Sequence, residues 1–579
     1  MLELKEVHYT LPREEADLHL LRDVSLKVRP GHFMAIVGPS GCGKTTLLKV
    51  IAGLQFETSG QILWRGEDVS EGGDIKPQEL GYVPQFSIAC EHLTVEECVD
   101  TAAKLRTRAG GDELNDITDR VIEEVGMESS RDKRVSVLSG GQKRRLGLAM
   151  ELVSHPPLLL CDEVTSGLDP QSERDILQLL HALSLHDDRI VVNVTHSLSN
   201  LDLYDSVLVM YEGHVIFHGT PDAMPHYFSS ESAGAIYPML AMRKAPDWHE
   251  SWQKYRDAYY EKLDHRLDER PHPAGAGDGG ATGSPAEAPL VPGDEHEPSS
   301  QFRQFVVLTA RRWKLFFRDR TQLLLHLALL FGFPILVVIF ATDGMPAMPE
   351  LNVPDTLEGM KARAHNVEKQ VEIGGLISGL VMFQVILLTL MGSNNSAREI
   401  AAERLTYEKE RLGGMAPMAY LASKIAFLAV LVAVQSLWMG VFVNHFTDLP
   451  GSLAEKIKML FLVNGAMTSV CLAISANMKS PEQASLLSIY LVGFQLPLSG
   501  AVLALPGALE KIVQPLIAAY WSWSGQLSSM RNSDYFVAIN QAVPTEIVSS
   551  SATSTAVLMA HILCGLAAAW IGCKRHRWQ

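Results

Sequence analysis

The sequence divides near Arg320 into two halves of different character. Long apolar runs without charged residues occur only after this residue, and each of the six is close to the ~20 residues that a helix needs to cross a bilayer. These runs are approximately Thr321–Ala341, Ile373–Gly392, Ile425–Val443, Met459–Ala476, Ala484–Leu505 and Ser550–Cys573. They exclude a wholly soluble enzyme and a wholly disordered chain. Residues 321–579 are therefore predicted to form an all-α transmembrane domain with six spans.

The charge of the loops predicts how these spans are oriented. An even number of spans returns the carboxyl terminus to the side on which the first half lies. The basic ending KRHRWQ and the basic loop Ser393–Ser423 favour the cytoplasm for that side under the positive-inside rule. The first residues, MLELKEVHYT, contain charges and no apolar core, so no secretory signal is predicted there. We expect an integral membrane protein with both termini in the cytoplasm.

A further apolar stretch lies between the fifth and sixth runs. The segment Gly507–Ile547 is expected on the external side, and part of it, Ile512–Leu527, is apolar enough to resemble a seventh span. A seventh crossing would place the basic carboxyl-terminal residues outside, against the positive-inside rule. We therefore interpret Ile512–Leu527 as a re-entrant or interfacial helix.

The first half is predicted to be soluble. In residues 1–225, short β-rich runs such as Phe33–Val37, Leu158–Cys161 and Ile190–Val194 alternate with helical stretches, which is typical of an α/β domain built on a largely parallel sheet. The chain has 50 Lys and Arg against 66 Asp and Glu, a net charge of −16. Nucleic-acid-binding domains carry a basic face, so we expect no nucleic acid among the partners.

A helical extension is predicted for residues 226–270. Its main helix is Asp247–Leu263, in which Asp247 and Glu250 resemble a capping box. One face of this helix carries aromatic residues at helical spacing, namely Trp248, Trp252, Tyr255 and Tyr259. We expect that face to dock on the soluble domain.

Two segments connect this extension to the spans. Residues 271–300 are rich in Pro, Gly and Ala, cannot bury a core, and are predicted to be a disordered linker. Residues 301–320 form a basic amphipathic pattern that suits a connecting helix at an anionic membrane surface. The alternative for them is an ordinary surface helix of the soluble domain.

The motif GPSGCGKT follows the apolar run FMAIV and predicts a phosphate-binding loop. In such a loop, backbone N–H groups at the start of a helix cradle phosphates, and glycines permit the close approach. Lys44 would supply a charge to the phosphates, the Thr45 hydroxyl would ligate Mg²⁺, and Thr46 would add a phosphate contact. The predicted phosphate-binding residues here are Gly38, Pro39, Ser40, Gly41, Cys42, Gly43, Lys44, Thr45 and Thr46.

Polar residues at the ends of three apolar runs predict hydrolytic chemistry. Asp162 and Glu163 end the run LLLCDE, where Asp162 is placed to hold Mg²⁺ and Glu163 to polarise the attacking water as general base. Gln85 ends LGYVPQ and His196 ends IVVNVTH, where each can reach the γ-phosphate. The predicted catalytic residues are Glu163, His196 and Gln85, and the predicted metal ligands are Thr45, Gln85 and Asp162.

The string LSGGQ, Leu138–Gln142, stands upstream of LLLCDE. Ser139, Gly140, Gly141 and Gln142 are predicted to form a second anion-binding helix start. Alone, SGG is a common turn, so this prediction depends on the order of the motifs.

That order resembles an ABC transporter nucleotide-binding domain. The phosphate loop, the Gln85 loop, LSGGQ, the Asp-Glu pair, SGLD at Ser166–Asp169 and His196 follow one another at the family's spacing. The resemblance implies that Tyr9 stacks on adenine and that the cofactors are ATP and Mg²⁺. We therefore expect an α/β P-loop NTPase fold in residues 1–225, followed by the six-helix transmembrane domain.

The domain order and the run LTVEECVDTAAKLR resemble the ABCG, or white, subfamily. The loop Glu403–Lys424 resembles the cytoplasmic loop of type-2 ABC exporters, which begins as a coupling helix. The chain departs from the subfamily at Val164, where Pro is usual, at NVTHSLSN, which lacks His-Gln-Pro, and in the general form of LSGGQ. The last departure and the lack of cysteines in the predicted external segments suggest a bacterial relative, and hence a bacterial inner membrane.

The resemblance also implies a partner. In this family each ATP lies between the phosphate loop of one domain and the LSGGQ of another, and this chain has one of each. The chain is therefore expected to be a half-transporter that pairs with a second copy or with a paralogous half-transporter.

The spans carry few ionisable groups, chiefly His326 and His561, which are candidates for function or for helix packing. Phe383 and Phe494 would line an apolar cleft. We expect ATP-driven export or translocation of a hydrophobic or amphipathic substrate, with membrane lipid as a partner. The alternative is a mechanotransmitter, in which ATP moves the spans to act on an external or periplasmic partner and nothing crosses.

Overall fold

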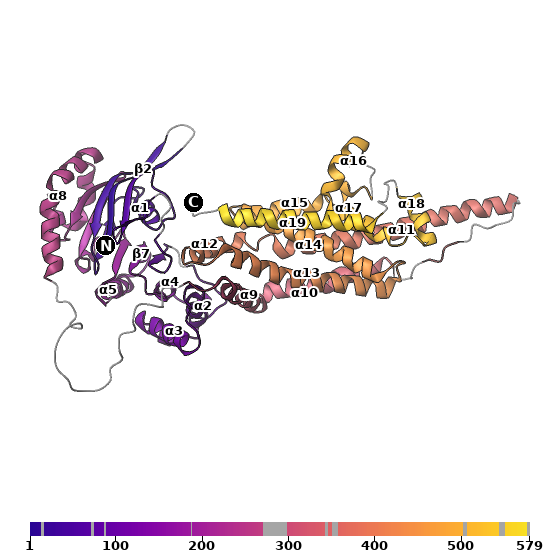
Figure 1. Cartoon of the computed structure of the whole chain (residues 1–579), viewed down its shortest axis with the longest axis horizontal. Helices are drawn as coiled ribbons and strands as arrows, with labels where there is room; N and C mark the ends of the chain where they lie inside the picture. Colours follow the sequence, from indigo (N-terminus) through magenta and orange to yellow (C-terminus); the bar gives the residue numbers. More distant parts are fainter. Residues whose placement is uncertain are drawn as a thin grey trace. The chain divides into compact units, whose positions relative to one another are not determined.

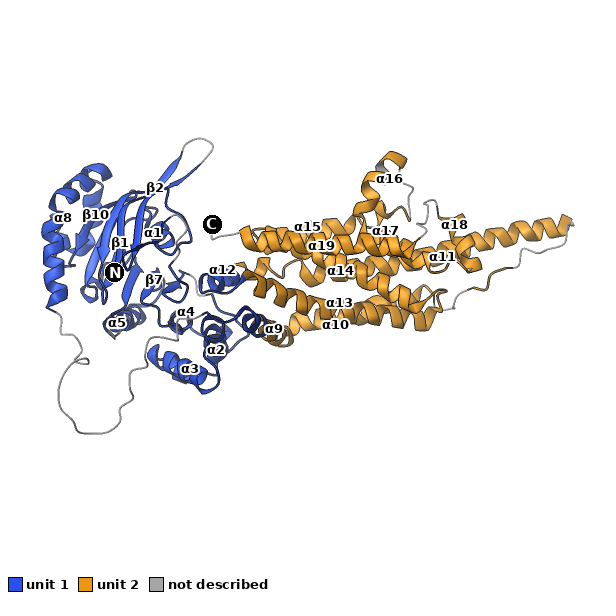
Figure 2. Ribbon diagram, viewed as in Figure 1, with its two compact units in different colours: residues 1–307, 405–416, 577–579 blue, residues 308–404, 417–576 orange. Residues whose placement is uncertain are grey.

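The structure is a computed structural model that describes residues 1–12, 17–70, 75–85, 88–186, 188–269, 298–341, 346–349, 357–501, 506–543 and 550–575. It divides into two compact units, drawn in blue and orange in Figure 2. The first unit comprises residues 1–307, 405–416 and 577–579, and the second comprises residues 308–404 and 417–576. Most of the predicted linker, residues 271–297, lies outside the described part of the chain.

The first unit contains a six-stranded, mainly parallel sheet. Its strands are β3 (Phe33–Val37), β6 (Leu80–Val83), β7 (Leu158–Asp162), β8 (Ile190–Val194), β9 (Ser206–Tyr211) and β10 (His214–Gly219). They lie in the order β10-β9-β3-β8-β7-β6, and only β10 pairs antiparallel, with β9. Every residue of β3, β7 and β8 is buried, because helices cover both faces of such a sheet. The three β-rich runs cited above are thus confirmed as strands.

A second, antiparallel sheet and eight helices complete most of this unit (Figure 1). The sheet has the order β2-β1-β4-β5, with β1 (Leu2–Leu11), β2 (Leu18–Val28), β4 (Ser59–Trp64) and β5 (Glu67–Asp68). The helices are α1 (Lys44–Ile51), α2 (Val95–Arg106), α3 (Asp112–Glu124), α4 (Gly140–Leu152), α5 (Pro170–His186), α6 (Ala223–Tyr227), α7 (Ile236–Leu240) and α8 (Ala245–Asp268). The predicted α/β architecture is therefore confirmed.

The main helix of the extension, α8, packs on β10 but begins earlier than predicted. It starts at Ala245 after Lys244, with Pro246 in the first turn and no side-chain capping bond, so the predicted capping box of Asp247 and Glu250 is wrong. The reason is that proline, which lacks an N–H, suits the first turn and fixes the helix start upstream. Asp247 then lies inside the first turn, where a negative charge still favours the helix.

The aromatic stripe of α8 is docked as predicted along most of its length. Trp248 and Trp252 are buried, and the ring centroids of Trp252 and of Phe217 on β10 lie 5.8 Å apart. The ring centroid of Tyr259 lies 5.4 Å from that of the same Phe217. Tyr255 departs from the stripe, since half of its side-chain surface is exposed.

The second unit is helical (Figure 1). Its helices are α10 (Arg320–Ile339), α11 (Leu357–Ser396), α13 (Pro417–Thr447), α14 (Leu453–Asn477), α15 (Pro481–Gly493), α16 (Gly507–Val513), α17 (Ala518–Ser528), α18 (Asp534–Ala542) and α19 (Ser551–Arg575). Helix α9 (Gln301–Arg318) begins in the first unit and ends in the second, and most of α12 (Arg404–Leu412) belongs to the first. Among the described residues, five helical segments are long and apolar enough to cross a membrane: α10, the segment Leu357–Leu412 that runs from α11 through the 3₁₀ turn Ala401–Glu403 to α12, α13, α14 and α19.

The fifth predicted span differs from the expectation. Helix α15 has 13 residues, or about 20 Å at 1.5 Å per residue, and ends at Gly493. A short 3₁₀ turn at Pro497–Ser499 follows, and then Gly500 with a φ of 74°. Because proline and a left-handed glycine both interrupt an α-helix, the prediction of one continuous helix over Ala484–Leu505 is wrong. Five of the six predicted spans thus correspond to long helices, and this one is broken.

Helix α17 covers most of the apolar stretch that was predicted to be re-entrant or interfacial. All residues from Ala518 to Leu527 are buried, and the helix packs against α11, α14 and α19. An interfacial helix would expose one face, so the burial of α17 on all sides favours the re-entrant alternative over the interfacial one. The preceding short helix α16 is different, because Ile512 is 70% exposed.

The two intramembrane histidines make local hydrogen bonds. His326 is buried on α10 and its Nδ1 lies 2.8 Å from the carbonyl oxygen of Gln322, one turn earlier. His561 on α19 makes the same kind of bond to Val557 at 2.9 Å. Both bonds lie within the histidine's own helix, so they do not test a role in packing between helices.

Candidate active site

The phosphate loop lies between β3 and α1, as the motif predicts. Gly38 has a φ of 153° and Gly43 a φ of 103°. A Cβ atom at Gly38 would lie 2.2 Å from the carbonyl oxygen of Met210, and one at Gly43 would lie 2.6 Å from that of Leu20. Only glycine fits such approaches, so the surrounding strands fix the path of the loop. Its N–H groups precede the start of α1, where the helix dipole attracts anions.

Lys44 is folded over the loop. Its Nζ donates to the carbonyl oxygens of Gly38 and Pro39, at 2.9 Å each, and the residue is buried. Cys42 Sγ lies 3.9 Å from the same nitrogen. A buried ammonium group among these neutral acceptors can bind a negatively charged acceptor more strongly. Phosphate oxygens in the loop would be such acceptors, which is the role predicted for Lys44.

Two of the three predicted metal ligands are adjacent. The Thr45 hydroxyl donates to Asp162 Oδ1 at 3.0 Å. Burial raises the pKa of Asp162 above its usual range, although hydrogen bonds from Thr45 and Tyr82 oppose this shift. A buried carboxylate beside a hydroxyl offers the oxygen ligands that Mg²⁺ prefers, and a cation there would compensate the buried charge. The residues present therefore fit Mg²⁺.

The three predicted catalytic residues meet at Glu163. Gln85 Nε2 donates to Glu163 Oε2 at 2.6 Å, and His196 Nε2 lies 2.6 Å from Glu163 Oε1. Glu163 also has a φ of 51°, a left-handed conformation that costs a non-glycine residue on the order of 1–3 kcal/mol. The fold thus holds this carboxylate in a strained position between two strand-end side chains. The amide nitrogen of Gln85 is hydrogen-bonded to Glu163. If Gln85 is a metal ligand, as predicted, the atom that binds the metal is therefore its side-chain carbonyl oxygen.

The LSGGQ string forms the start of α4. Ser139 is the N-cap, its Oγ accepts from the N–H of Gln142 at 3.3 Å, and Gln142 Oε1 accepts from the N–H of Ser139 at 3.0 Å. Gly140 is exposed. In the described part of the chain, the side-chain hydrogen bonds of Ser139 stay within this capping box. LSGGQ therefore forms a capped helix start at which Ser139 and Gly140 are exposed to solvent.

Tyr9 lies one strand away from the phosphate loop. It pairs in register with Leu21 on β2, and a Cβ at Gly43 would meet both the carbonyl of Leu20 and the side chain of Leu21. Tyr9 and Thr46 are both half-buried. Tyr9 is thus on β1, the strand that pairs with β2, and β2 is the strand that contacts the phosphate loop.

Two sets of interactions in the first unit, one of Tyr82 and one of Glu151, were not predicted from the sequence. Tyr82 on β6 hydrogen-bonds to Asp162, a link that only the parallel pairing of β6 with β7 creates. Glu151 on α4 is buried between two cations, Arg106 Nη2 at 2.5 Å and Lys409 Nζ at 3.1 Å. Its only sequence signal is a charged residue inside the apolar stretch LGLAMELV.

Comparison with known families agrees with this geometry. The family model described as ABC transporter matches residues 21–166, and the model described as ABC-2 type transporter matches residues 303–523. The first covers the phosphate loop, LSGGQ and the Asp-Glu pair. The second covers most of the helices of the second unit.

Individual relatives cover different shares of the chain. The ABC transporter ATP-binding/permease protein Rv1747 of Mycobacterium tuberculosis is 30% identical over 517 residues, which is 87% of this chain and 55% of that protein. ABC transporter G family member 26 of Arabidopsis thaliana is 34% identical over 251 residues, which is 42% of this chain and 36% of that protein. This chain thus spans about half, or less, of the length of these relatives.

Among solved structures, the dimeric ATP-binding cassette MJ0796 bound to ADP and Pi is 28% identical, with a TM-score of 0.35, and the match covers 38% of this chain and 99% of that one. The family assignment does not depend on this similarity. The two family matches and their order, cassette first and membrane domain second, establish that the chain belongs to the ABC transporter family.

Proposed function

We propose that this protein is an ATP-driven half-transporter that hydrolyses ATP and moves a hydrophobic or amphipathic substrate across a membrane. The observation that carries the proposal is the meeting of Gln85 and His196 on Glu163, beside the phosphate loop. Such a carboxylate, held at the edge of a nucleotide site, is placed to take a proton from an attacking water.

The chemistry assigned to the site is in-line hydrolysis. Lys44 and the loop N–H groups hold the phosphates, and Glu163 accepts a proton as the water oxygen bonds to the γ-phosphorus. The bond from the γ-phosphorus to the β–γ bridging oxygen breaks, and ADP and phosphate leave. Mg²⁺, held by Thr45 and Asp162 with Gln85 as the third predicted ligand, would neutralise phosphate charge. His196 and Gln85 orient the base through the bonds they make to its two oxygens.

A second chain completes each site in this proposal. The open helix start at Ser139, Gly140, Gly141 and Gln142 would contact the ATP held by the partner's phosphate loop. The simplest partner is a second copy of the chain, which would give two equivalent sites. A paralogous half-transporter is the other possibility.

Contacts inside the first unit support a path from nucleotide to membrane domain. Helix α12 carries Lys409, which pairs with the buried Glu151 of the LSGGQ helix α4. Although burial acts to raise it, Arg106 and Lys409 hold the pKa of Glu151 below its ordinary value. Because a buried carboxylate cannot leave both cations without a large desolvation cost, we infer that α12 moves with α4.

Gln304, near the start of α9, connects this helix to α2 and to the loop after α12. Gln304 donates to the carbonyl oxygens of Leu105, at 3.1 Å, and Gly414, at 3.0 Å, and accepts from the N–H of Ala416 at 2.9 Å. One side chain thus joins the end of α2, the loop after α12 and the amphipathic helix. These contacts make α9 and α12 the proposed carriers of motion to the spans. The basic, partly exposed α9 is also our candidate for contact with anionic lipid.

An open apolar groove on the surface of the second unit is consistent with a hydrophobic cargo. It has a volume of about 300 Å³ and is lined by Phe340, Leu376, Gly379, Leu380 and Phe383, of which Phe340 is 64% exposed. Phe383, one of the two predicted cleft residues, lines it. The other, Phe494, is 57% exposed and directly follows the last residue of α15.

The proposed setting is the inner membrane of a bacterium, with the first unit and both termini in the cytoplasm. The experiment is ATPase activity of the purified protein in nanodiscs, with a panel of lipids and amphipaths, against Glu163→Gln as the inactive control. We expect basal turnover that at least one apolar compound stimulates. Absence of turnover in the parent protein would reject the ATPase, and turnover that no compound changes, together with no movement of labelled lipid in proteoliposomes, would reject the cargo class.

A further inference from the structure

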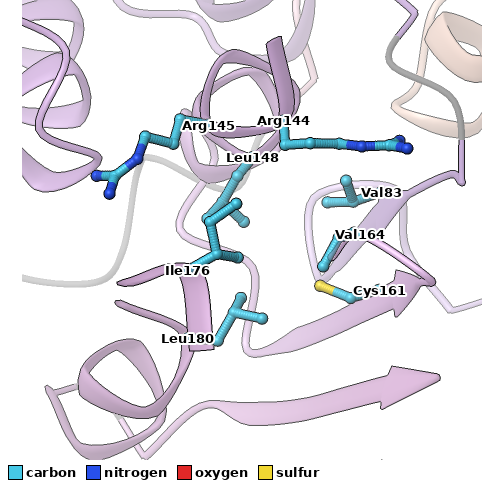
Figure 3. A pocket seen from close by; sticks show the side chains of 8 residues that line it. All are labelled: Val83, Arg144, Arg145, Leu148, Cys161, Val164, Ile176 and Leu180. Atoms are coloured by element: carbon cyan, nitrogen blue, oxygen red, sulfur yellow. The ribbon is translucent and has the colours of Figure 1, made fainter. Parts of the chain in front are cut away.

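A cavity beside the Asp-Glu strand end is lined by Val83, Cys161 and Val164, among other residues (Figure 3). It measures about 10 Å³, room for about one water molecule, and is too small for a ligand. The surroundings of the phosphate loop are more informative, because three separate segments of the first unit support this loop.

The first support is the hairpin that joins β9 and β10. A Cβ atom at Gly38 would lie 2.2 Å from the carbonyl oxygen of Met210, near the end of β9. The carbonyl oxygen of Cys42, further along the loop, accepts a hydrogen bond of 3.0 Å from the N–H of Gly213, in the turn of the hairpin. The hairpin therefore contacts the loop at two points, and a displacement of the hairpin would displace the loop.

The second support is strand β2, which lies against the same turn. The N–H of Arg22 donates to the carbonyl oxygen of Gly213 at 2.9 Å. The carbonyl oxygen of Leu20 lies 2.6 Å from the position of a Cβ atom at Gly43 and 2.8 Å from that of one at Gly213. The strand, the turn and the loop are thus packed without space for a side chain. Whatever holds β2 and β10 together therefore also holds the phosphate loop.

The third support is one side chain of α8, the helix that lies beside β10 (Figure 2). His249 Nδ1 lies 2.8 Å from the carbonyl oxygen of Val215 on β10, and His249 Nε2 lies 3.0 Å from Asp23 Oδ2 on β2. A carbonyl oxygen and a carboxylate can only accept hydrogen bonds. A ring that makes both bonds must donate from both nitrogens, so it carries a positive charge.

The same ring has a second arrangement. Gln253 Nε2, one turn further along α8, lies 3.2 Å from His249 Nε2. An amide nitrogen can only donate, so this bond needs a neutral ring with a lone pair on Nε2. The positive ring is thus bound to β2, the neutral ring is bound to a residue of its own helix, and the bond to Val215 is open to both. Loss of one proton therefore releases β2 from α8.

The other titratable and charged groups around His249 come from three strands. The ring centroid of His214 on β10 lies 4.9 Å from that of His249, and His8 Nδ1 on β1 accepts from the N–H of Asp23 at 3.4 Å. Burial and the nearby charges of His249, Arg22 and His8 lower the pKa of His214 to about 4, and Asp23 opposes this shift. His214 is therefore neutral near pH 7 and does not repel a positive His249 ring.

We propose that His249 is a positioning residue for the phosphate loop, and that it holds β2 and β10 in the arrangement that binds ATP only while its ring is protonated. The inference rests on the proposed function, because it takes the phosphate loop as the ATP site. A loop that is ordered before binding loses less freedom when the nucleotide arrives. Because the charge of a histidine ordinarily changes between about pH 5 and 8, ATP affinity should weaken as the pH rises through this range.

The experiment measures the affinity of the full-length protein in nanodiscs for trinitrophenyl-ATP at pH 6, 7 and 8. The ratio of the parent's affinity to that of the His249→Gln protein should fall about three-fold from pH 6 to pH 8, since glutamine does not titrate. Effects of pH on the nucleotide or on the rest of the site are common to both proteins and cancel in this ratio.

Two further variants test the route of the effect. Asp23→Asn keeps the histidine but removes the charge of its acceptor, so it should show the same pH profile as His249→Gln. It also carries the test if His249→Gln fails to fold, which thermal unfolding at pH 7 would reveal. His265→Gln is the matched control, because it makes the same substitution on α8 at a side chain that is 73% exposed. It should keep the parent's profile.

The outcomes separate this inference from the proposed function. The parent's pH profile in the His249→Gln or the Asp23→Asn protein, or loss of that profile in the His265→Gln protein, would overturn the inference and leave the proposed ATPase standing. Failure of the parent protein to bind the nucleotide at any of the three pH values would reject both.

Discussion

At the scale of single residues, the site is organised around one strained carboxylate. Glu163 has a left-handed backbone, and each of its oxygens is bound by a different strand-end side chain. A conformation of this cost persists only when the surroundings impose it. The strand ends supply that constraint, and this agrees with a role for Glu163 in the chemistry and not only in packing.

Replacing Glu163 by Gln should abolish ATP turnover and preserve ATP binding. The amide is nearly isosteric and keeps the phosphate loop intact, but it cannot accept the proton of the attacking water. We expect a fall of at least about 100-fold in turnover, measured by phosphate release, with nucleotide affinity unchanged. Near-normal turnover would remove Glu163 from the role of base.

Lys44→Ala should act on binding itself. Its ammonium group is buried with two carbonyl acceptors, and its loss removes the main charge available to the phosphates. Nucleotide affinity, measured by fluorescence of trinitrophenyl-ATP, should fall about ten-fold or more. An affinity equal to that of the parent would contradict the assignment of the loop.

A buried histidine on β10 predicts a pH dependence of stability. Burial lowers the pKa of His218 to about 4, whereas an unfolded histidine has a pKa of about 6.5. The neutral ring is therefore favoured by folding, so its stabilising effect is complete above pH 6.5 and is lost as the pH falls toward 4. Between pH 6.5 and 5 this group should cost the fold about 2 kcal/mol.

The measurement is thermal unfolding of the full-length protein at pH 7, 6 and 5. His218→Gln, which does not titrate, should lose less stability over this range than the parent. His265→Gln is the matched control, because the side chain of His265 is 73% exposed. Identical pH dependence of the His218→Gln and parent proteins would disprove the prediction.

At the scale of elements, the informative feature is that α12 belongs with the nucleotide-binding unit and not with the helices beside it in sequence. Lys409 accounts for this placement, because its ammonium group is buried against the carboxylate of Glu151 on α4. This ion pair joins α12, a charged helix of nine residues, to α4 within the first unit.

Lys409→Met should weaken both stability and coupling. Leaving Glu151 with one cation fewer should lower the free energy of unfolding by about 3 kcal/mol, and Lys409→Arg should recover most of it. Basal ATPase should remain, while stimulation by apolar compounds should disappear. The test is to measure chemical denaturation and stimulated ATPase on the same preparations, and full stimulation in a destabilised Lys409→Met protein would separate α12 from coupling.

At the scale of the whole molecule, the open helix start at Ser139 predicts that the working unit is a dimer. A mixed dimer of one Lys44→Ala chain and one Ser139→Arg chain would carry both defects in one shared site and leave the other intact. The test is cross-linking from residue 139 to bound nucleotide in a two-tag preparation of the mixed dimer. Cross-links only to nucleotide held by the same chain would exclude the shared site.

The sequence by itself determined the features that depend on neighbouring residues. The phosphate loop, the Asp-Glu strand end and most of the long apolar helices are local patterns, so backbone geometry and hydropathy suffice to predict them. They also predicted that Gln85, His196 and Glu163 lie at strand ends near the γ-phosphate, whereas the hydrogen bonds of Gln85 and His196 to Glu163 became apparent only in the fold. The order of these motifs was enough to point to the family.

Tertiary structure alone decided the features that depend on residues distant in sequence. The pairing of Lys409 with Glu151, the bond of Tyr82 to Asp162 and the bonds of His249 to two strands arise from packing between separate elements. The broken helix after Gly493 and the all-round burial of α17 were likewise hidden, because hydropathy reports that a segment avoids water and not what covers it. The local sequence pattern determines which secondary structure each segment can form. The partner of each charged side chain is determined only by contacts between segments that are distant in the sequence.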